Sequence, residues 1–163
     1  MKRPYSHPSR RAILAGLAAF GAASIGRSPV IAAAGARLAR PIPATGEQLP
    51  VIGMGSWITF DVGDDAAARA ERVEVLRTFF DEGGALVDSS PMYLSSQEVI
   101  GHCLARLPDT SALFAATKVW TMSRALGIRQ MEASQQLWGV ERFDLMQVHN
   151  LLDWEAHLPT LNE

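Results

Sequence analysis

The sequence predicts an α/β fold in which parallel strands alternate with helices. Amphipathic stretches separate short apolar runs, and the runs begin about thirty residues apart, which is the length of a βα unit. Right-handed crossovers join such units, so the strands of the sheet should be parallel. Four runs are apolar at successive positions, as in strands buried on both faces: Val51–Met54, Ala85–Val87, Leu113–Thr117 and Asp144–Val148.

The first 36 residues have the composition of an export signal. Arg10 and Arg11 stand directly before an apolar stretch rich in Ala and Gly, which is followed by a second Ala-rich segment. The pair resembles a twin-arginine signal, with Ile13 where the motif more often has Phe. Arg27 interrupts the apolar run, which is shorter than the roughly 20 residues that span a bilayer, so no stable membrane span is expected.

This interpretation divides the chain into two parts. Residues 1–36 form the twin-arginine signal peptide and its cleavage region, with cleavage expected after Ala34 or Ala36. Residues 37–163 form the folded domain. The twin-arginine export machinery is therefore an expected partner, and the periplasm is the expected location.

The elements of the folded domain follow in order. A short β-hairpin is expected within Pro41–Pro50, because Thr45-Gly46 supplies a turn between apolar flanks. A helix is predicted over Asp65–Glu82, with Gly83 as its stop. Its inward face carries apolar residues at helical spacing: Val73, Leu76, Phe79 and Phe80.

Two more helices and the start of a third complete the alternation. Ser95–Glu98 has the pattern of a capping box and opens a helix that Pro108 ends. The next helix is predicted over 124–138, with Gly139 as terminator. A further helix begins within the final stretch "LLDWEAHLPTLNE". The inward residues of the first of these helices are Val99, Ile100, Cys103, Leu104 and Leu107.

Composition excludes several classes of function. A net charge of −2, from 15 Lys and Arg against 17 Asp and Glu, predicts no basic face for nucleic acid. Cys103 is the single cysteine and is expected in the core, so neither an intrachain disulfide nor a thiolate metal cluster can form. His102 and His157 lack metal-ligand spacing and are interpreted as surface or helix-lining residues. Trp138 and Trp154 are interpreted as packing groups.

Parallel α/β proteins bind ligands at the carboxyl ends of their strands. Both a doubly wound open sheet and an eight-stranded barrel consist of βα units, and the thirty-residue period does not choose between them. The "GMG" of Gly53–Gly55 lacks the third glycine of a dinucleotide fingerprint. Each of the four predicted strands delivers polar or aromatic groups to one rim: Ser56, Trp57, Asp88, Tyr93, Lys118, Trp120, His149 and Asn150.

These residue types suit the reduction of a carbonyl group. A phenol beside an ammonium group releases its proton more readily, so Lys118 would activate Tyr93, and Asp88 would hold Lys118 in place. Tyr93 would then protonate a carbonyl oxygen whose position His149 fixes by a hydrogen bond. No side chain supplies a hydride, so a nicotinamide cofactor must bring it.

Four stretches, "GMGSW", "SSPMYLSSQEVIG" directly after Asp88, "ATKVW" and "DLMQVHN", resemble the aldo-keto reductases. The resemblance implies a (β/α)8 barrel that uses NADP(H) to reduce aldehydes and ketones. Leu94 departs from the glycine usual in the family, which puts the turn that aims Tyr93 in question. The resemblance implies three sets of residues: catalytic Asp88, Tyr93, Lys118 and His149; cofactor-binding Ser56, Asp88 and Asn150; and substrate-pocket walls Trp57 and Trp120.

A full barrel needs about 250 residues, whereas residues 37–163 suffice for the first four βα units. They would form the N-terminal half of the barrel, without the half that holds the cofactor phosphate. We therefore expect the chain to be inactive by itself. The alternative is a non-catalytic half-barrel that serves as a structural or binding module. Open sheet edges would then pair with another copy or with a partner.

Overall fold

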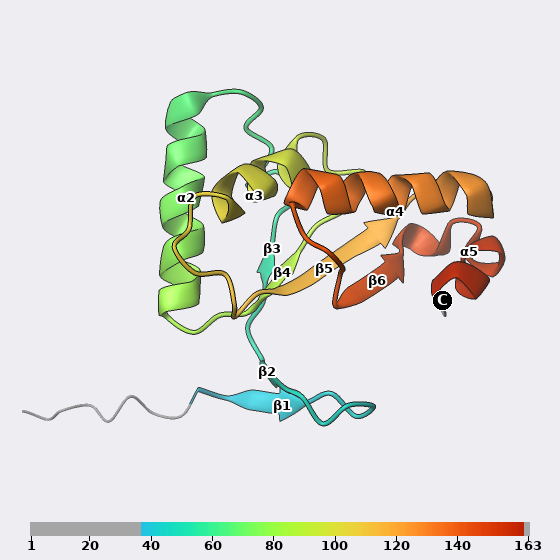
Figure 1. The fold of residues 1–163 in the computed structure, drawn as a ribbon, viewed down its shortest axis with the longest axis horizontal. Helices are drawn as coiled ribbons and strands as arrows, with labels where there is room; N and C mark the ends of the chain where they lie inside the picture. Colours follow the sequence, from blue (N-terminus) through green and yellow to red (C-terminus); the bar gives the residue numbers. More distant parts are fainter. Residues whose placement is uncertain (1–36, 162–163) are drawn as a thin grey trace, which may run out of the picture. The chain divides into compact units, whose positions relative to one another are not determined.

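The computed structural model describes residues 37–161, which form a β-hairpin followed by a four-stranded sheet with helices (Figure 1). The export signal predicted in residues 1–36 lies outside this range. The hairpin pairs β1 with β2, antiparallel, and the sheet contains β3 to β6. The strands are β1 Ala39–Pro41, β2 Gln48–Pro50, β3 Met54–Gly55, β4 Leu86–Asp88, β5 Phe114–Val119 and β6 Leu145–Val148.

Helices connect the strands in the predicted alternation, and successive helices pack on one another in chain order (Figure 1). One helix follows each strand of the sheet, and a short 3-10 helix, η1, comes directly after β6. The helices are α2 Ala66–Asp81, α3 Ser96–Leu104, α4 Arg124–Trp138, η1 His149–Leu151 and α5 Trp154–Leu161.

The order of strands in the sheet decides between the two architectures. All four strands are parallel, and their order β3-β4-β5-β6 follows the chain without a crossover to the other side. A doubly wound sheet reverses its strand order at a switch point, whereas a (β/α)8 barrel adds strands sequentially. The described sheet therefore has the order of four consecutive barrel units.

Local sequence signals account for the helix ends. Asp65 caps α2, because its carboxylate accepts hydrogen bonds from the N–H groups of Ala67 and Ala68, both at 2.9 Å. Gly139 ends α4 in a left-handed conformation with φ of 69°. A residue without Cβ adopts this conformation at no steric cost. The predictions of α2 and α4 are confirmed.

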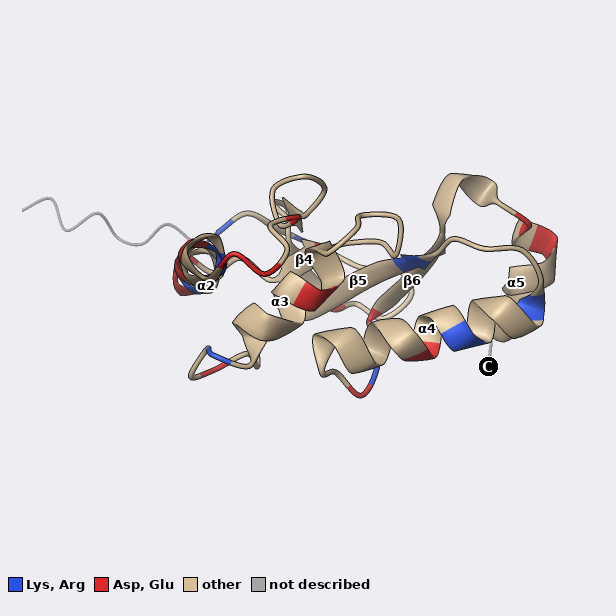
Figure 2. Cartoon of the chain, turned by 90° about the horizontal axis from the view of Figure 1, so that it is seen from above, with Lys and Arg blue, Asp and Glu red and all other residues tan. Residues whose placement is uncertain are grey.

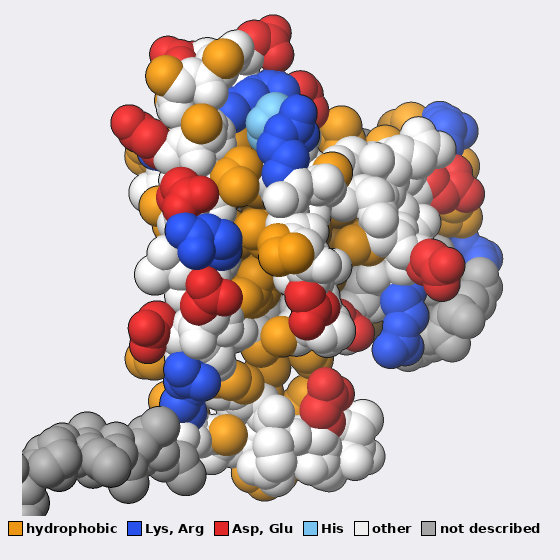
Figure 3. Space-filling model, turned by 60° about the vertical axis from the view of Figure 1, so that its left-hand side comes forward, with side chains coloured by type: hydrophobic (Ala, Val, Ile, Leu, Met, Phe, Trp, Pro, Cys, Tyr) orange, Lys and Arg blue, Asp and Glu red, His pale blue; other side chains and the backbone are white. Residues whose placement is uncertain are grey.

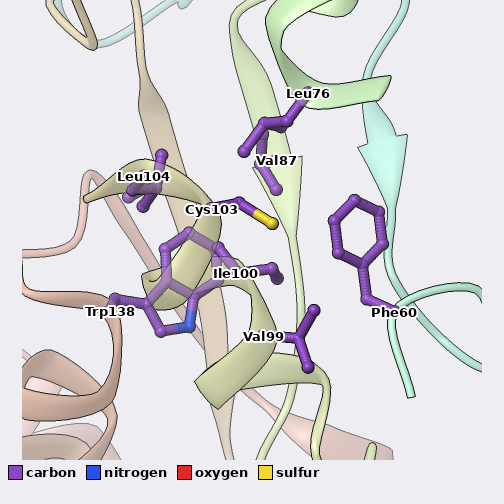
Figure 4. Packing of buried hydrophobic residues seen from close by; sticks show 9 residues of the cluster. Phe60, Leu76, Val87, Val99, Ile100, Cys103, Leu104 and Trp138 are labelled. Carbon is purple, nitrogen blue, oxygen red and sulfur yellow. The ribbon is translucent and has the colours of Figure 1, made fainter. Parts of the chain in front are cut away.

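A compact apolar cluster joins α2 and α3 to the sheet (Figure 4). Val87 of β4 lies between Leu76 of α2 and Ile100 of α3, and all three are fully buried. Cys103 is also fully buried, as predicted, and burial raises the pKa of its thiol to about 11. A thiol with so high a pKa is unreactive at neutral pH.

Of the strand predicted over Val51–Met54, only Met54 lies in a strand of the sheet. Val51 is exposed and its N–H donates to the carbonyl of Leu38, so it extends the hairpin. Ile52 is 70% exposed, and β3 begins only at Met54. The run of apolar residues has the pattern of one buried strand. The pattern alone does not show where the hairpin ends and the sheet begins.

The predicted capping box at Ser95 is also wrong, although the helix itself is confirmed. The Ser95 side chain makes no cap hydrogen bond to α3. Its hydroxyl donates to Asp61 at 2.5 Å and accepts from the N–H of Gly63 at 3.0 Å. Ser95 therefore fixes the loop between β3 and α2 against the start of α3.

His157 and Trp154 differ from their predicted environments. His157 is fully buried, and its Nε2–H donates to the carbonyl of Thr121 at 2.9 Å. The ring fits against α4 only because Gly127 has no side chain, since a Cβ there would lie 2.6 Å from the ring. Trp154 is half-exposed at the start of α5, whereas Trp138 is buried as predicted.

The charged surface carries no extended patch of one sign on the face drawn in Figure 3, where acidic and basic side chains alternate. On α2, Arg77 pairs with both Glu74 and Asp81. Within residues 37–161, no helix has the length and apolar character needed to cross a membrane.

Candidate active site

An ion pair between neighbouring strands forms the centre of the candidate site. Lys118 lies near the carboxyl end of β5, where Figure 2 shows a basic band beside β6, and Asp88 is the last residue of β4. The Lys118 ammonium contacts both Asp88 carboxylate oxygens, at 2.7 and 2.6 Å, and the carbonyl of Ser89 at 2.8 Å. The two side chains are only 14% and 27% exposed. Removal of one partner from such a pair leaves a partly buried charge uncompensated, which costs more than at an exposed pair.

Tyr93 lies beside this ion pair. The Lys118 ammonium is 5.4 Å from the centre of the Tyr93 ring, a cation–π distance. The His149 ring meets Tyr93 edge-on, with 5.6 Å between ring centres, and Trp57 lies on Tyr93 at 6.2 Å. The carboxylate, ammonium, phenol and imidazole from three neighbouring strand ends are therefore brought together.

The turn that carries Tyr93 keeps the conformation that a glycine would adopt. The Tyr93 N–H donates to the carbonyl of Ser90, and the Tyr93 carbonyl accepts from the N–H of Ser96, both at 2.9 Å. Leu94 takes φ of 51°, in the left-handed region. Leucine therefore stands in a backbone conformation that glycine would adopt at lower cost.

Ser90 sets the hydrogen-bonding state of His149. The Ser90 hydroxyl accepts from the N–H of Met92 at 3.2 Å and lies 2.6 Å from Nδ1 of His149. When this hydroxyl donates its hydrogen to Nδ1, Nε2–H of the neutral ring is left to donate to a ligand. Burial, and then the charge of Lys118, lowers the pKa of His149 against the opposing effect of Asp88. The neutral ring is therefore favoured.

Sequence reasoning missed three supporting groups. They are the carbonyl of Ser89, the hydroxyl of Ser90, and the amide of Gln147, which donates to Asp88 at 3.3 Å. Ser89 and Ser90 lie between Asp88 and Tyr93 in the chain, and Gln147 lies opposite Lys118 in the β5–β6 register. Gln147 lies two residues before His149, and residues two apart in a strand point to the same face of the sheet. This alternation alone would have placed the Gln147 amide on the same face as the His149 ring.

The predicted cofactor and pocket residues surround this centre. Ser56 follows β3, and its N–H donates to the carbonyl of Asp88 at 3.1 Å, but its hydroxyl is buried without a partner among the described residues. Asn150 is exposed directly after His149. Trp57 and Trp120 are exposed, and the Trp120 ring lies 6.4 Å from that of His149. Their roles stay predictions.

Between residues 37 and 161, no group of three or more His, Cys, Asp or Glu side chains could hold a metal ion. The described part of the chain therefore supplies organic acid–base groups at the strand ends and no metal-ligand cluster.

Comparison with known proteins agrees with this geometry. Residues 51–161 match the model of the aldo/keto reductase family, which covers more than half of the sequence. The chain belongs to the aldo/keto reductase family.

This chain is similar to only part of the length of several relatives of known function or structure. Methylglyoxal reductase YeaE of Escherichia coli is 29% identical over 103 residues, which cover 62% of this chain and 35% of that protein. The aldo-keto reductase PA4992 of Pseudomonas aeruginosa superposes with a TM-score of 0.64 at 27% identity, covering 77% of this chain and 54% of that one. An aldo/keto reductase of Klebsiella pneumoniae, solved with NADP and acetate, gives 0.55 at 27% identity, covering 64% and 36%. The chain thus spans about a third to a half of the length of these relatives.

Proposed function

We propose that this site reduces the carbonyl group of an aldehyde or ketone, with Tyr93 as the proton donor and NADPH as the source of hydride. The observation that carries the proposal is the contact of Tyr93 with both the Lys118 ammonium and the His149 ring. In this proposal the phenol, the ammonium group and Nε2–H of His149 act on one carbonyl oxygen.

Each residue has a distinct task in this proposal. Lys118 places positive charge beside the Tyr93 ring, 5.4 Å from its centre. Asp88 holds Lys118 in place through both carboxylate oxygens. His149 donates from Nε2 to the substrate oxygen and so fixes its direction. Trp57 and Trp120 would form apolar walls of the substrate pocket once additional strands close the site.

The residues near the centre fit the ribose and amide end of a nicotinamide cofactor. The unpartnered Ser56 hydroxyl lies next to Asp88 and has an unmet hydrogen bond, and the exposed Asn150 offers both a donor and an acceptor. Ser56, Asp88 and Asn150 are the residues that would hold this end. When bound, the cofactor supplies the hydride that no side chain can. The Lys118 ammonium already donates to the Asp88 carboxylate, so we assign Lys118 no contact with the cofactor phosphate.

The relatives support the same chemistry. The similar Klebsiella pneumoniae structure contains NADP, and the similar Escherichia coli protein is a methylglyoxal reductase. Both points concern those proteins. They support NADP(H) and a carbonyl compound as the cofactor and the substrate class that we propose for this chain.

We further propose that the 163-residue chain is inactive without additional strands. In the described sheet, β3 pairs only with β4 and β6 pairs only with β5. The catalytic groups would then face solvent instead of a closed, dry cavity. The same two free edges favour the alternative function, a half-barrel module that associates with a second copy or a partner.

The decisive assay follows NADPH absorbance with an aromatic aldehyde, using the chain alone and a chimera that joins it to the second half of YeaE. We expect oxidation only by the chimera, and its loss in the Tyr93→Phe variant. Tyr93→Phe retaining more than about a tenth of the rate would refute the role of Tyr93, since acid catalysis contributes roughly 100-fold or more. Light scattering of the chain alone tests association with a second copy, which a strict monomer would contradict.

We also propose that residues 1–36 direct export by the twin-arginine route to the periplasm. Support comes from the paired Arg10 and Arg11 before an apolar stretch. Fractionation of cells that express the full chain tests this, and protein found solely in the cytoplasm at full length would contradict it.

A further inference from the structure

The hydroxyl of Ser90 lies between the turn that carries Tyr93 and the ring of His149. Ser90 is fully buried two residues after the end of β4, whereas His149 directly follows β6. The Ser90 hydroxyl oxygen lies 2.6 Å from Nδ1 of His149 and accepts from the N–H of Met92 at 3.2 Å. The Ser90 carbonyl accepts from the N–H of Tyr93 at 2.9 Å. One residue therefore joins the proposed proton donor to the proposed hydrogen-bond donor.

The surroundings of this hydroxyl decide where its hydrogen lies. Within residues 37–161, Nδ1 of His149 is the acceptor within hydrogen-bonding distance of the Ser90 hydroxyl, and the Met92 N–H is a donor. If Nδ1 carried a hydrogen, the ring would donate to Ser90, and the Ser90 hydroxyl hydrogen would be left buried without an acceptor. Unpaired buried groups of this kind are unfavourable and rare in folded proteins. Every group is satisfied when the hydroxyl donates to Nδ1 and the neutral ring carries its hydrogen on Nε2.

The other contacts of the His149 ring agree with a neutral imidazole. Burial, followed by the charge of Lys118, lowers the pKa of His149, and Asp88 opposes this effect only in part. The Tyr93 ring meets the His149 ring edge-on, with an angle of 84° between their planes, and the Trp120 ring lies 6.4 Å away. Within the described part of the chain Nε2 makes no hydrogen bond, so its hydrogen remains available to a ligand.

We propose that Ser90 is a positioning residue of the site, whose hydroxyl keeps the hydrogen of His149 on Nε2 and holds the imidazole ring beside Tyr93. A ring with its hydrogen on Nδ1 would present the lone pair of Nε2 to the carbonyl oxygen, so that two acceptors would face each other. The inference rests on the proposed function only for the substrate oxygen that receives the bond from Nε2–H. The position of the hydrogen itself requires neither substrate nor cofactor.

The test records the nitrogen resonances of the histidine rings in the full chain near neutral pH, because the two nitrogens of a neutral ring differ in shift according to which one carries the hydrogen. The His149→Gln variant assigns the His149 signals by their loss. We expect the unmodified chain to carry the hydrogen on Nε2. In Ser90→Ala the ratio of this tautomer to the other should fall about fivefold, which is the effect of one hydrogen bond between neutral groups.

Two further variants separate the hydroxyl from the side chain that carries it. Ser90→Cys keeps the approximate shape but offers a weaker donor, so the tautomer ratio should fall in the same direction by a smaller factor. Ser89→Ala is the matched control, because the adjacent Ser89 hydroxyl is equally buried and has no partner among the described residues. Its removal should leave the His149 tautomers unchanged. Circular dichroism confirms that each variant is folded.

In the chimera with the second half of YeaE, Ser90→Ala should lower kcat about fivefold and change KM little, because the bond from Nε2–H strengthens as charge develops on the substrate oxygen. The proposal is overturned by hydrogen on Nδ1 in the unmodified chain, by an unchanged tautomer ratio in Ser90→Ala, or by an equal change in Ser89→Ala. A shifted ratio without NADPH oxidation by the unmodified chimera would remove the proposed function alone. Oxidation with an unchanged ratio would remove the role of Ser90 alone.

Discussion

Replacing Lys118 by Met should destabilise the protein well beyond the usual effect of a lost surface charge. Lys118 donates to both oxygens of Asp88 and to the carbonyl of Ser89. Removing it leaves the Asp88 carboxylate, 27% exposed, with the Gln147 amide at 3.3 Å as its remaining side-chain partner. Breaking a fully buried pair costs about 3–5 kcal/mol and an exposed pair about 1 or less. For this partly buried pair we expect about 2–3 kcal/mol.

A double-mutant cycle separates the ion pair from the loss of the lysine side chain. In Asp88→Asn/Lys118→Met neither charge is left unpaired, so the double variant should lose about 1.5 kcal/mol less than the sum of the two single variants. Urea unfolding followed by circular dichroism supplies the four free energies. Arg77→Met is the control, because its ion pairs on α2 are exposed and its loss should change the free energy of unfolding far less.

Additivity of the two single variants within about 0.5 kcal/mol would refute the reasoning, since groups in direct contact must couple. An equal loss in Arg77→Met would refute it as well, because the cost could then not be assigned to partial burial of the Asp88–Lys118 pair.

Two further predictions concern packing and pH. Gly101→Ala should lower the free energy of unfolding by about 3 kcal/mol in urea titrations, because the new Cβ would lie 1.8 Å from the Leu137 carbonyl oxygen of α4. A loss below about 1 kcal/mol would show that α3 and α4 are not in such close contact. The pKa of His149 is lowered by burial and next by Lys118, so the unfolded chain binds the proton more readily and stability falls as pH drops below about 6.5. His149→Gln should reduce the loss of stability between pH 7.5 and 5.5, and an identical loss in both proteins would contradict the lowered pKa.

Much of the fold follows from sequence because its signals are local. The 3.6-residue pattern and the stop at Gly139 predicted α4 with its observed bounds, and Asp65 and Gly83 bracketed α2. The thirty-residue spacing predicted parallel βα units but not their order. Only the hydrogen bonds between strands show that β3-β4-β5-β6 is sequential, which separates a barrel from a doubly wound sheet.

The errors arose where a tertiary contact overrides a local pattern. Ser95 matches a capping box, but its hydroxyl is engaged by Asp61, 34 residues earlier in the chain. His157 has no unusual sequence neighbours, and its burial depends on the absent side chain of Gly127 on another helix. No periodicity within a single element contains either piece of information.

The sequence nominated the residues of the candidate site, but it did not predict the hydrogen bonds between them. Strand ends and the family resemblance nominated Asp88, Tyr93, Lys118 and His149, and the structure brings all four together. The contact of the Ser90 hydroxyl with Nδ1 of His149 depends on a turn conformation, which sequence spacing does not specify.

The central claim is that the phenol and the imidazole, from different strand ends, meet beside the ammonium. A nuclear Overhauser experiment on the full chain with assigned aromatic protons tests it directly. An edge-on contact with 5.6 Å between ring centres predicts cross-peaks between the Tyr93 and His149 rings. Assigned spectra in which each ring shows cross-peaks to other neighbours and none to the other ring would contradict it.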